Sequence, residues 1–177
     1  WTLVRALDCL VAGATGRVRI PGFYDAVRPL PAAERAHIAD LPDPTPAWRE
    51  QYGLTSFPGG LEGAALLERV IGDPTATIAG LTSGYAGPGL KTIVPAVARA
   101  KIDFRLVPDQ DPGDILRKLR AHLDAHGFTD VKITDLGGDA PARHPQAPGL
   151  DLGGHGFRRG PRHHEYRQGG GMVGAVD

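Results

Sequence analysis

Apolar residues recur along this chain at helical spacing in three segments. Residues 1–12, residues 61–71 and the stretch that follows Pro112 each carry them three or four positions apart, as a helix does when it packs by one face. Gly13 ends the first of these segments and Gly127 ends the last. The three apolar stripes consist of Leu3, Val4, Leu7, Leu10 and Val11, then Leu61, Ala65, Leu66 and Ile71, then Ile115, Leu116, Leu119 and Leu123.

Three further segments have the composition or the alternation of a strand with one buried face. Residues 75–81 carry β-favouring threonines around an isoleucine, and residues 128–136 place Val131 and Ile133 toward the interior. The alternation is clearest in the segment that starts at Ala96. In that segment Ile102, Phe104 and Leu106 share one face, while Lys101, Asp103 and Arg105 share the other.

The order of these elements predicts the fold. Residues 17–60 are rich in proline, and we interpret them as an irregular excursion with short helices at 32–39 and 47–52. The chain then runs helix, strand, strand, helix, strand, which is most of a β-α-β-β-α-β arrangement. We therefore predict an α/β (α+β) fold, a two-layer ferredoxin-like sandwich whose antiparallel sheet carries two helices on one face. Its first strand is missing, and the sheet is expected to expose an edge there.

The composition changes after Pro145. Residues 1–145 are predicted to form one domain, and residues 146–177 are predicted to be a disordered tail because they are rich in glycine and arginine and have little hydrophobic periodicity. The chain does not begin with Met, and a helix starts at its first residue. We therefore expect it to be a piece of a longer protein.

Charge and cysteine content exclude several classes of function. Twenty basic and twenty acidic residues give a net charge of zero, which does not favour a nucleic-acid-binding surface. The single cysteine, Cys9, excludes an internal disulfide and disfavours a thiolate zinc site. No run of about 18 apolar residues is present, so no membrane span is expected. We expect a cytoplasmic protein that binds neither nucleic acid nor membrane.

The segment from Gly80 to Pro112 resembles one enzyme family. A glycine-rich loop leads into Lys91-Thr92-x-x-Pro95, and about ten residues later the chain reads Arg-Leu-Val-Pro-x-Gln-Asp-Pro from Arg105 onward. This pattern is similar to that of the di-zinc metallopeptidases that include carnosine dipeptidase, acetylornithine deacetylase and aminoacylase. Residues 1–7 and 16–25 also resemble the dipeptidase-like branch, so the resemblance covers residues 1–145.

The resemblance implies that this chain is the lid, or dimerisation, domain of such an enzyme. The complete enzyme would hydrolyse peptide or N-acyl amide bonds with two zinc ions that a separate catalytic domain holds. No zinc ion is expected to be bound by this chain, which is expected to be inactive by itself and to form a homodimer. The substrate would be a small peptide or an N-acyl amino acid. The alternative is a non-catalytic ferredoxin-like module that binds a small ligand or a partner, because the fold alone does not separate the two.

Two residues are the candidates for contact with substrate, and no catalytic residue is assigned. The guanidinium of an arginine on a rigid strand can bind a carboxylate, and the resemblance implies that Arg105 binds the terminal carboxylate of the substrate. The same resemblance gives Thr92 a contact with the substrate, which its hydroxyl can make as donor or acceptor. Arg105 could instead pair with Asp103 or Asp109, and Thr92 could bond within its own loop. The loop glycines Gly84, Gly87 and Gly89 do not have dinucleotide-binding spacing and are interpreted as a tight turn.

The histidines are interpreted as non-catalytic. His122 and His126 lie four positions apart on the last predicted helix and could chelate an ion, but surface histidines near a helix C-terminus are the favoured interpretation. His155, His163 and His164 lie in the glycine-rich tail, where only adventitious metal binding is expected. No metal ligand is therefore assigned.

Overall fold

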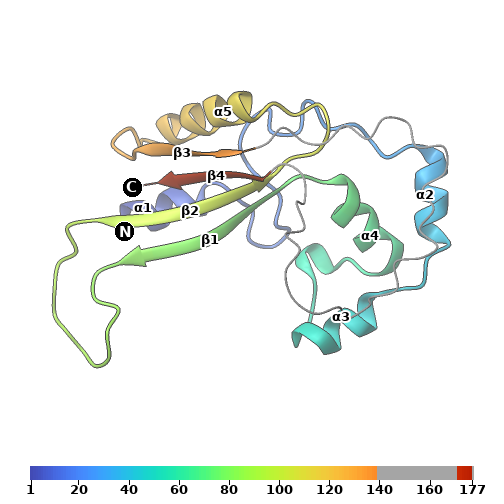
Figure 1. The fold of residues 1–177 in the computed structure, drawn as a ribbon, viewed down its shortest axis with the longest axis horizontal. Helices are drawn as coiled ribbons and strands as arrows, with labels where there is room; N and C mark the ends of the chain where they lie inside the picture. The colour runs from blue at the N-terminus through green and yellow to red at the C-terminus, as the bar shows by residue number, and fades with distance from the viewer. Residues whose placement is uncertain (139–170, 177) are drawn as a thin grey trace.

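The structure, a computed structural model, describes residues 1–138 and 171–176. Within these residues a four-stranded antiparallel sheet is covered by helices, and the excursion forms a separate group of helices at one end (Figure 1). The elements are α1 (Thr2–Asp8), α2 (Ala32–Ala39), α3 (Thr45–Tyr52), the 3-10 helix η1 (Pro58–Gly60), α4 (Gly63–Gly72), β1 (Thr75–Ser83), β2 (Ala98–Arg105), α5 (Pro112–Ala125), β3 (Ile133–Gly138) and β4 (Gly171–Val176).

The sheet has the order β1-β2-β4-β3, so the last strand of the chain lies inside it. β4 is antiparallel to both neighbours, with Ile102 opposite Gly174 and Ile133 opposite Val176. In a β-α-β-β-α-β sandwich the first strand would occupy this position. The α+β fold class is confirmed, but the prediction of a disordered tail is wrong for residues 171–176, and neither β2 nor β3 exposes the expected edge. The remaining tail residues, 139–170 and 177, lie outside the described residues.

The core lies between the sheet and the two helices α1 and α5. Phe104 on β2 has no exposed surface, and it packs against Phe23 of the excursion with ring centroids 6.1 Å apart. As the alternation predicts, the apolar face of β2 is buried. The cluster also contains Leu3, Ala6 and Leu10 from α1 and its end, Val18, Ile20, Ala100, Ile102 and Leu106, Ile115, Leu119 and Leu123 from α5, and Val131. The two helices therefore share one face of the sheet.

Two predicted elements end or begin elsewhere. The first helix stops at Asp8, because the residues after it pair with the strand-like segment around Val18, where Arg19 donates its backbone N–H to Leu10 (2.7 Å). β3 starts at Ile133, later than predicted. The Arg120 guanidinium on α5 bonds the carbonyl oxygens of Phe128 (2.8 Å) and Val131 (2.5 Å), which ties this segment to the helix end.

The excursion forms a second, smaller packing unit with α4. The predicted helix at 32–39 is α2, and Ile38 on it is buried together with Leu66 on α4. Thr45 at the start of α3 is also buried, and its hydroxyl accepts a hydrogen bond from Gly63 N–H (2.9 Å). Among the described residues no helix has both the length and the apolar composition that crossing a membrane requires.

Candidate functional site

Arg105 is the last residue of β2, on the polar face of the strand. Its neighbour Phe104 points into the core and fixes the strand, so the guanidinium projects from a rigid position. The side chain is 66% exposed, and its Nε lies 3.5 Å from a carboxylate oxygen of Asp103. A contact of that length is weak. Asp109, the other predicted partner, pairs with Arg28 at 2.8 Å. The exposure of its side chain places Arg105 at the surface, at one end of the sheet.

Thr92 lies in the loop that joins β1 and β2, which we call the arm (residues 84–97). The arm continues the β1–β2 hairpin away from the rest of the molecule (Figure 1). Thr92 is exposed in it. Gly84 and Gly89 adopt positive φ, and a Cβ at Gly87 would collide with the ring of Tyr85. The Tyr85 hydroxyl donates to Pro88 O across this turn (3.0 Å). The interpretation of these glycines as turn residues is thus consistent with the structure.

Arg105 lies at one end of β2, and Thr92 lies beyond the other end. The seven steps from Ala98 to Arg105, at about 3.4 Å each, span about 24 Å, and the arm extends further from Ala98 (Figure 1). An extended dipeptide spans only about 7 Å. The fold of a single chain therefore does not bring Thr92 and Arg105 to the same small ligand.

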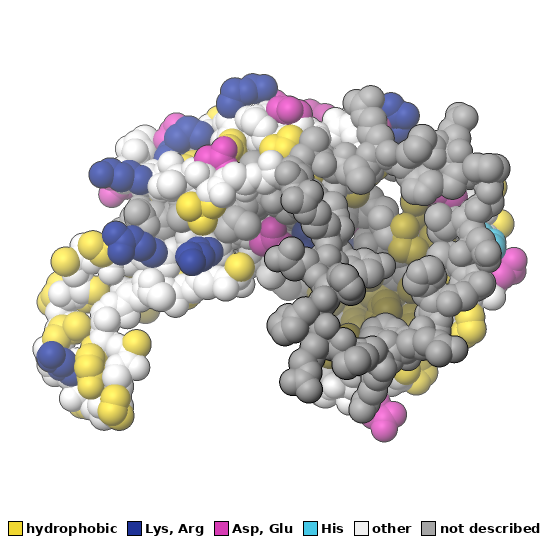
Figure 2. All heavy atoms as spheres, in the orientation of Figure 1, with side chains coloured by type: hydrophobic (Ala, Val, Ile, Leu, Met, Phe, Trp, Pro, Cys, Tyr) yellow, Lys and Arg dark blue, Asp and Glu magenta, His cyan; other side chains and the backbone are white. Residues whose placement is uncertain are grey.

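The arm also exposes apolar side chains. Leu90 is 98% exposed and Val94 is 95% exposed, and Tyr85, Ile93 and Val97 are exposed as well. Figure 2 shows hydrophobic side chains gathered along this projection, with few charges among them. Clustered apolar surface of this kind is typical of interaction sites.

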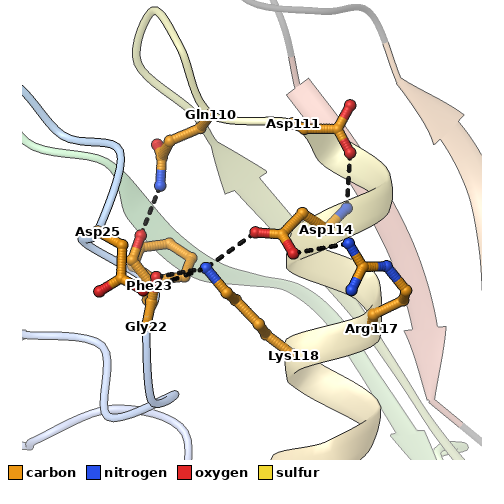
Figure 3. Close-up of polar contacts among 8 residues, drawn as sticks. All are labelled: Gly22, Phe23, Asp25, Gln110, Asp111, Asp114, Arg117 and Lys118. Carbon is orange, nitrogen blue, oxygen red and sulfur yellow. Dashed lines mark hydrogen bonds and ion pairs between the residues drawn. The ribbon is translucent and has the colours of Figure 1, made fainter.

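The remainder of the Arg-Leu-Val-Pro-x-Gln-Asp-Pro motif has a structural role. Gln110 is buried, and its amide nitrogen donates to Phe23 O (2.7 Å) (Figure 3). Its carbonyl oxygen accepts from Val107 N–H (2.9 Å). Asp111 caps α5 by accepting from Asp114 N–H (2.7 Å), and Pro112 is the first helical residue. The motif thus holds the excursion against the turn that follows Arg105. The helix start at Pro112 was predicted from the sequence, but the role of Gln110 was missed.

Lys118 makes a second connection between α5 and the excursion. Its ammonium donates to Gly22 O (2.7 Å), pairs with Asp114 (2.8 Å) and lies 3.6 Å from Asp25 (Figure 3). The hydrogen bond between Lys118 and Asp114 raises the pKa of Lys118 and lowers the pKa of Asp114. Gln110 and Lys118 thus both bond the backbone of the excursion, at Phe23 and at Gly22. These bonds hold the segment that packs against Phe104, the neighbour of Arg105 on β2.

The two histidines on α5 are not equivalent. His122 is only 5% exposed, so the prediction that both are surface residues is wrong for His122, whereas His126 is exposed. The fold places Cys9 beside them, and one ligand atom of each residue lies within 4.8 Å of the others. Burial lowers the pKa of His122, and it raises the pKa of the Cys9 thiol. Spacing along the sequence showed the histidine pair but not the cysteine, which is brought in by tertiary packing.

Comparison with known proteins assigns the chain to a family. Residues 25–131, more than half of the chain, match the model of the peptidase dimerisation domain. The chain is 27% identical over 123 residues to the mouse Beta-Ala-His dipeptidase, covering 70% of this chain and 25% of that protein. It is 27% identical to the Cys-Gly metallodipeptidase DUG1 of Saccharomyces cerevisiae, with the same two coverages. The chain therefore spans about a quarter of the length of the curated relatives that it matches.

Solved structures agree with this assignment. A metallo-carboxypeptidase of the M20 family from Sulfolobus solfataricus superposes with a TM-score of 0.64 at 36% identity, covering 72% of this chain and 29% of that chain. Human carnosine dipeptidase 1 superposes with a TM-score of 0.63 at 26% identity, covering 70% of this chain and 26% of that chain. The resemblance inferred from the Gly80 to Pro112 segment is confirmed at the level of the family.

Proposed function

This chain belongs to the peptidase dimerisation domain family, and from that premise we propose that it is the lid and dimerisation domain of a zinc-dependent, dipeptidase-like hydrolase. The complete protein would cleave peptide or N-acyl amide bonds of small substrates. The family match carries this proposal, and the dipeptidase names of the relatives support the substrate class. This chain by itself would be inactive, because its proposed part is to bind substrate rather than to cleave it.

Arg105 would bind the terminal carboxylate of the substrate. Its guanidinium can donate two parallel hydrogen bonds to a carboxylate, and the rigid strand end reduces the entropy lost on binding. The Gln110 contact fixes the turn that follows Arg105, and the Lys118 contact fixes α5, the helix after that turn. Thr92 would add one hydrogen bond through its hydroxyl, which can donate to a substrate oxygen.

Two chains would have to combine to place both residues on one substrate. Within one chain Thr92 and Arg105 are separated by the whole of β2, about 24 Å, which exceeds the length of a dipeptide. In a two-fold dimer the arm of one chain would deliver Thr92 to the substrate that Arg105 of the other chain holds. The exposed apolar side chains of the arm, Leu90 and Val94 above all, would be buried against the partner.

The two zinc ions would be held by the rest of the complete protein. A di-zinc site needs several carboxylate and imidazole ligands that converge on both ions. Within residues 1–138 and 171–176, the group of side chains placed to bind metal is Cys9, His122 and His126, which contains no carboxylate. These residues do not fit a di-zinc centre, so no hydrolytic step is assigned to this chain.

A mixed-dimer experiment tests the proposal in the complete protein that carries this domain. Arg105→Ala should lower kcat/KM for a dipeptide more than tenfold, because truncating one partner of a buried charge pair costs about 2–5 kcal/mol. Thr92→Ala should lower kcat/KM less. If the two residues of a site come from different chains, refolding the two variants together forms mixed dimers in which one site has both defects and the other has neither.

The mixed dimers should therefore recover about half of the wild-type activity per dimer if the two residues come from different chains. If both residues acted from one chain, each site of the mixed dimer would keep one defect and activity would not recover. Unchanged kinetics of Arg105→Ala with a carboxylate-ended dipeptide would contradict the carboxylate role itself. Arg99→Ala, another arginine on β2, is the matched control and should retain activity.

A further inference from the structure

A cluster with metal-binding chemistry lies between the two helices that cover the sheet. Cys9 directly follows α1, and His122 and His126 lie one turn apart on α5. One ligand atom of each residue lies within 4.8 Å of the other two. We propose that Cys9, His122 and His126 form a mononuclear Zn²⁺ site, with water as the fourth ligand. This site is additional to the proposed peptidase function and does not depend on it.

The donor set and the distances suit zinc. Thiolate sulfur and imidazole nitrogen are the ligands that Zn²⁺ prefers in proteins, and bonds of about 2.0–2.3 Å in a tetrahedron put the ligand atoms about 3.3–3.8 Å apart. The ligand atoms must therefore move closer together by at most about 1–1.5 Å. His126 is exposed and Cys9 lies in the turn beyond the helix, so rotation of these two side chains can supply the movement.

Backbone carbonyl groups already orient both imidazoles. The Nε2 atom of His122 lies 3.0 Å from Cys9 O, and the Nδ1 atom of His126 lies 2.8 Å from His122 O. In metal-ligating histidines the nitrogen that does not bind the ion usually donates to such a carbonyl, which fixes the tautomer and the ring plane. The burial of His122 also lowers its pKa, which favours the neutral imidazole that binds a metal ion.

Metal binding requires one proton to leave the cluster. The Cys9 thiol now donates to Ala6 O at 3.1 Å, and on coordination its proton passes to solvent while the sulfur donates an electron pair to the ion. The exposed edge of His126 gives the ion access. Asp124 pairs with Arg120 at 2.7 Å and is not part of the set. The bound ion would connect the end of α1 to α5.

Co²⁺ and Zn²⁺ titrations of the chain test the site. The four other histidines near the C-terminus (His144, His155, His163 and His164) are first replaced by asparagine, so that only His37 remains outside the cluster. We expect one Co²⁺ per chain with a near-ultraviolet thiolate-to-cobalt charge-transfer band. Zn²⁺ should displace Co²⁺, and it should raise Tm by about 5–10 °C at a free concentration of about 100 times Kd.

Three variants of the chain that carries the four asparagine replacements distinguish the proposed site from adventitious metal binding. Cys9→Ser should remove the charge-transfer band, and His126→Ala, at an exposed position, should weaken binding about tenfold or more. His37→Ala, at an exposed position on α2, should change nothing. Far-ultraviolet circular dichroism checks that each variant is folded. Failure of the parent chain to bind Co²⁺ saturably would overturn the proposal, as would an unchanged band in Cys9→Ser or unchanged affinity in His126→Ala.

Discussion

The covered face of β2 and the arm that leads into it differ in what surrounds their apolar residues, although they are continuous in sequence. On β2, Ile102 and Phe104 are buried against α1 and α5. A few residues earlier, Leu90 and Val94 are almost fully exposed. The difference shows which parts of this domain gain stability from the chain's own helices and which parts the chain leaves exposed, where we propose that a partner binds.

Removing the largest side chain of the covered face should have the largest effect on folding. Phe104 has no exposed surface, so Phe104→Ala removes its apolar contacts and leaves a cavity, and it should lower the free energy of unfolding by about 3–5 kcal/mol. Val94→Ala in the arm is the control, and it should change the free energy of unfolding by less than about 0.5 kcal/mol. Urea unfolding followed by circular dichroism measures both, and similar losses in the two variants would contradict the comparison.

Removing the Gln110 hydrogen bonds in the turn after Arg105 should have an intermediate effect on the free energy of unfolding. Gln110→Leu keeps the approximate size of the side chain but leaves Phe23 O and Val107 N–H without their partner, which should cost about 1–3 kcal/mol of unfolding free energy. Gln51→Leu, at an exposed position on α3, is the matched control and should cost less than about 0.5 kcal/mol. Thermal unfolding of both variants gives the difference. Equal stabilities would show that the Gln110 side chain does not hold the excursion.

Local periodicity was sufficient to predict the elements on the covered side. The alternation through Phe104 gave both faces of β2, and the stripe through Leu119 gave α5, because burial of one face is recorded directly in the residue pattern. The start of β3 was predicted too early, because the Arg120 hydrogen bonds that hold residues 128–131 to α5 leave no periodic signal. The Arg105 and Thr92 positions were found through the family resemblance, and their roles stay proposals.

Features that depend on distant segments could not be predicted in this way. Residues 171–176 include two glycines and have weak strand propensity, yet they form β4, because β2 and β3 offer two unpaired edges that an extended segment can satisfy. The meeting of Cys9 with His122 is similar, since more than a hundred residues separate them and only the packing of α1 beside α5 joins them. Sequence periodicity records the buried face of each helix but not which helix will be its neighbour.

The smallest effect on folding should come from the arm, where the effect on association should be large. Leu90→Glu combined with Val94→Glu adds two charges at positions that are 98% and 95% exposed, so the free energy of unfolding of the single chain should change by less than about 0.5 kcal/mol. If the arm is buried in a dimer, the same charges would be desolvated there, and dimers should be lost. Light scattering over a range of concentrations measures the loss of dimers.

Val70→Glu with Ile71→Glu, on exposed apolar residues of α4, is the matched control and should leave dimers intact. The proposal that a second chain covers the exposed apolar residues of the arm would be contradicted by either of two results. One is a parent chain that remains monomeric at high concentration, and the other is an arm variant that still dimerises.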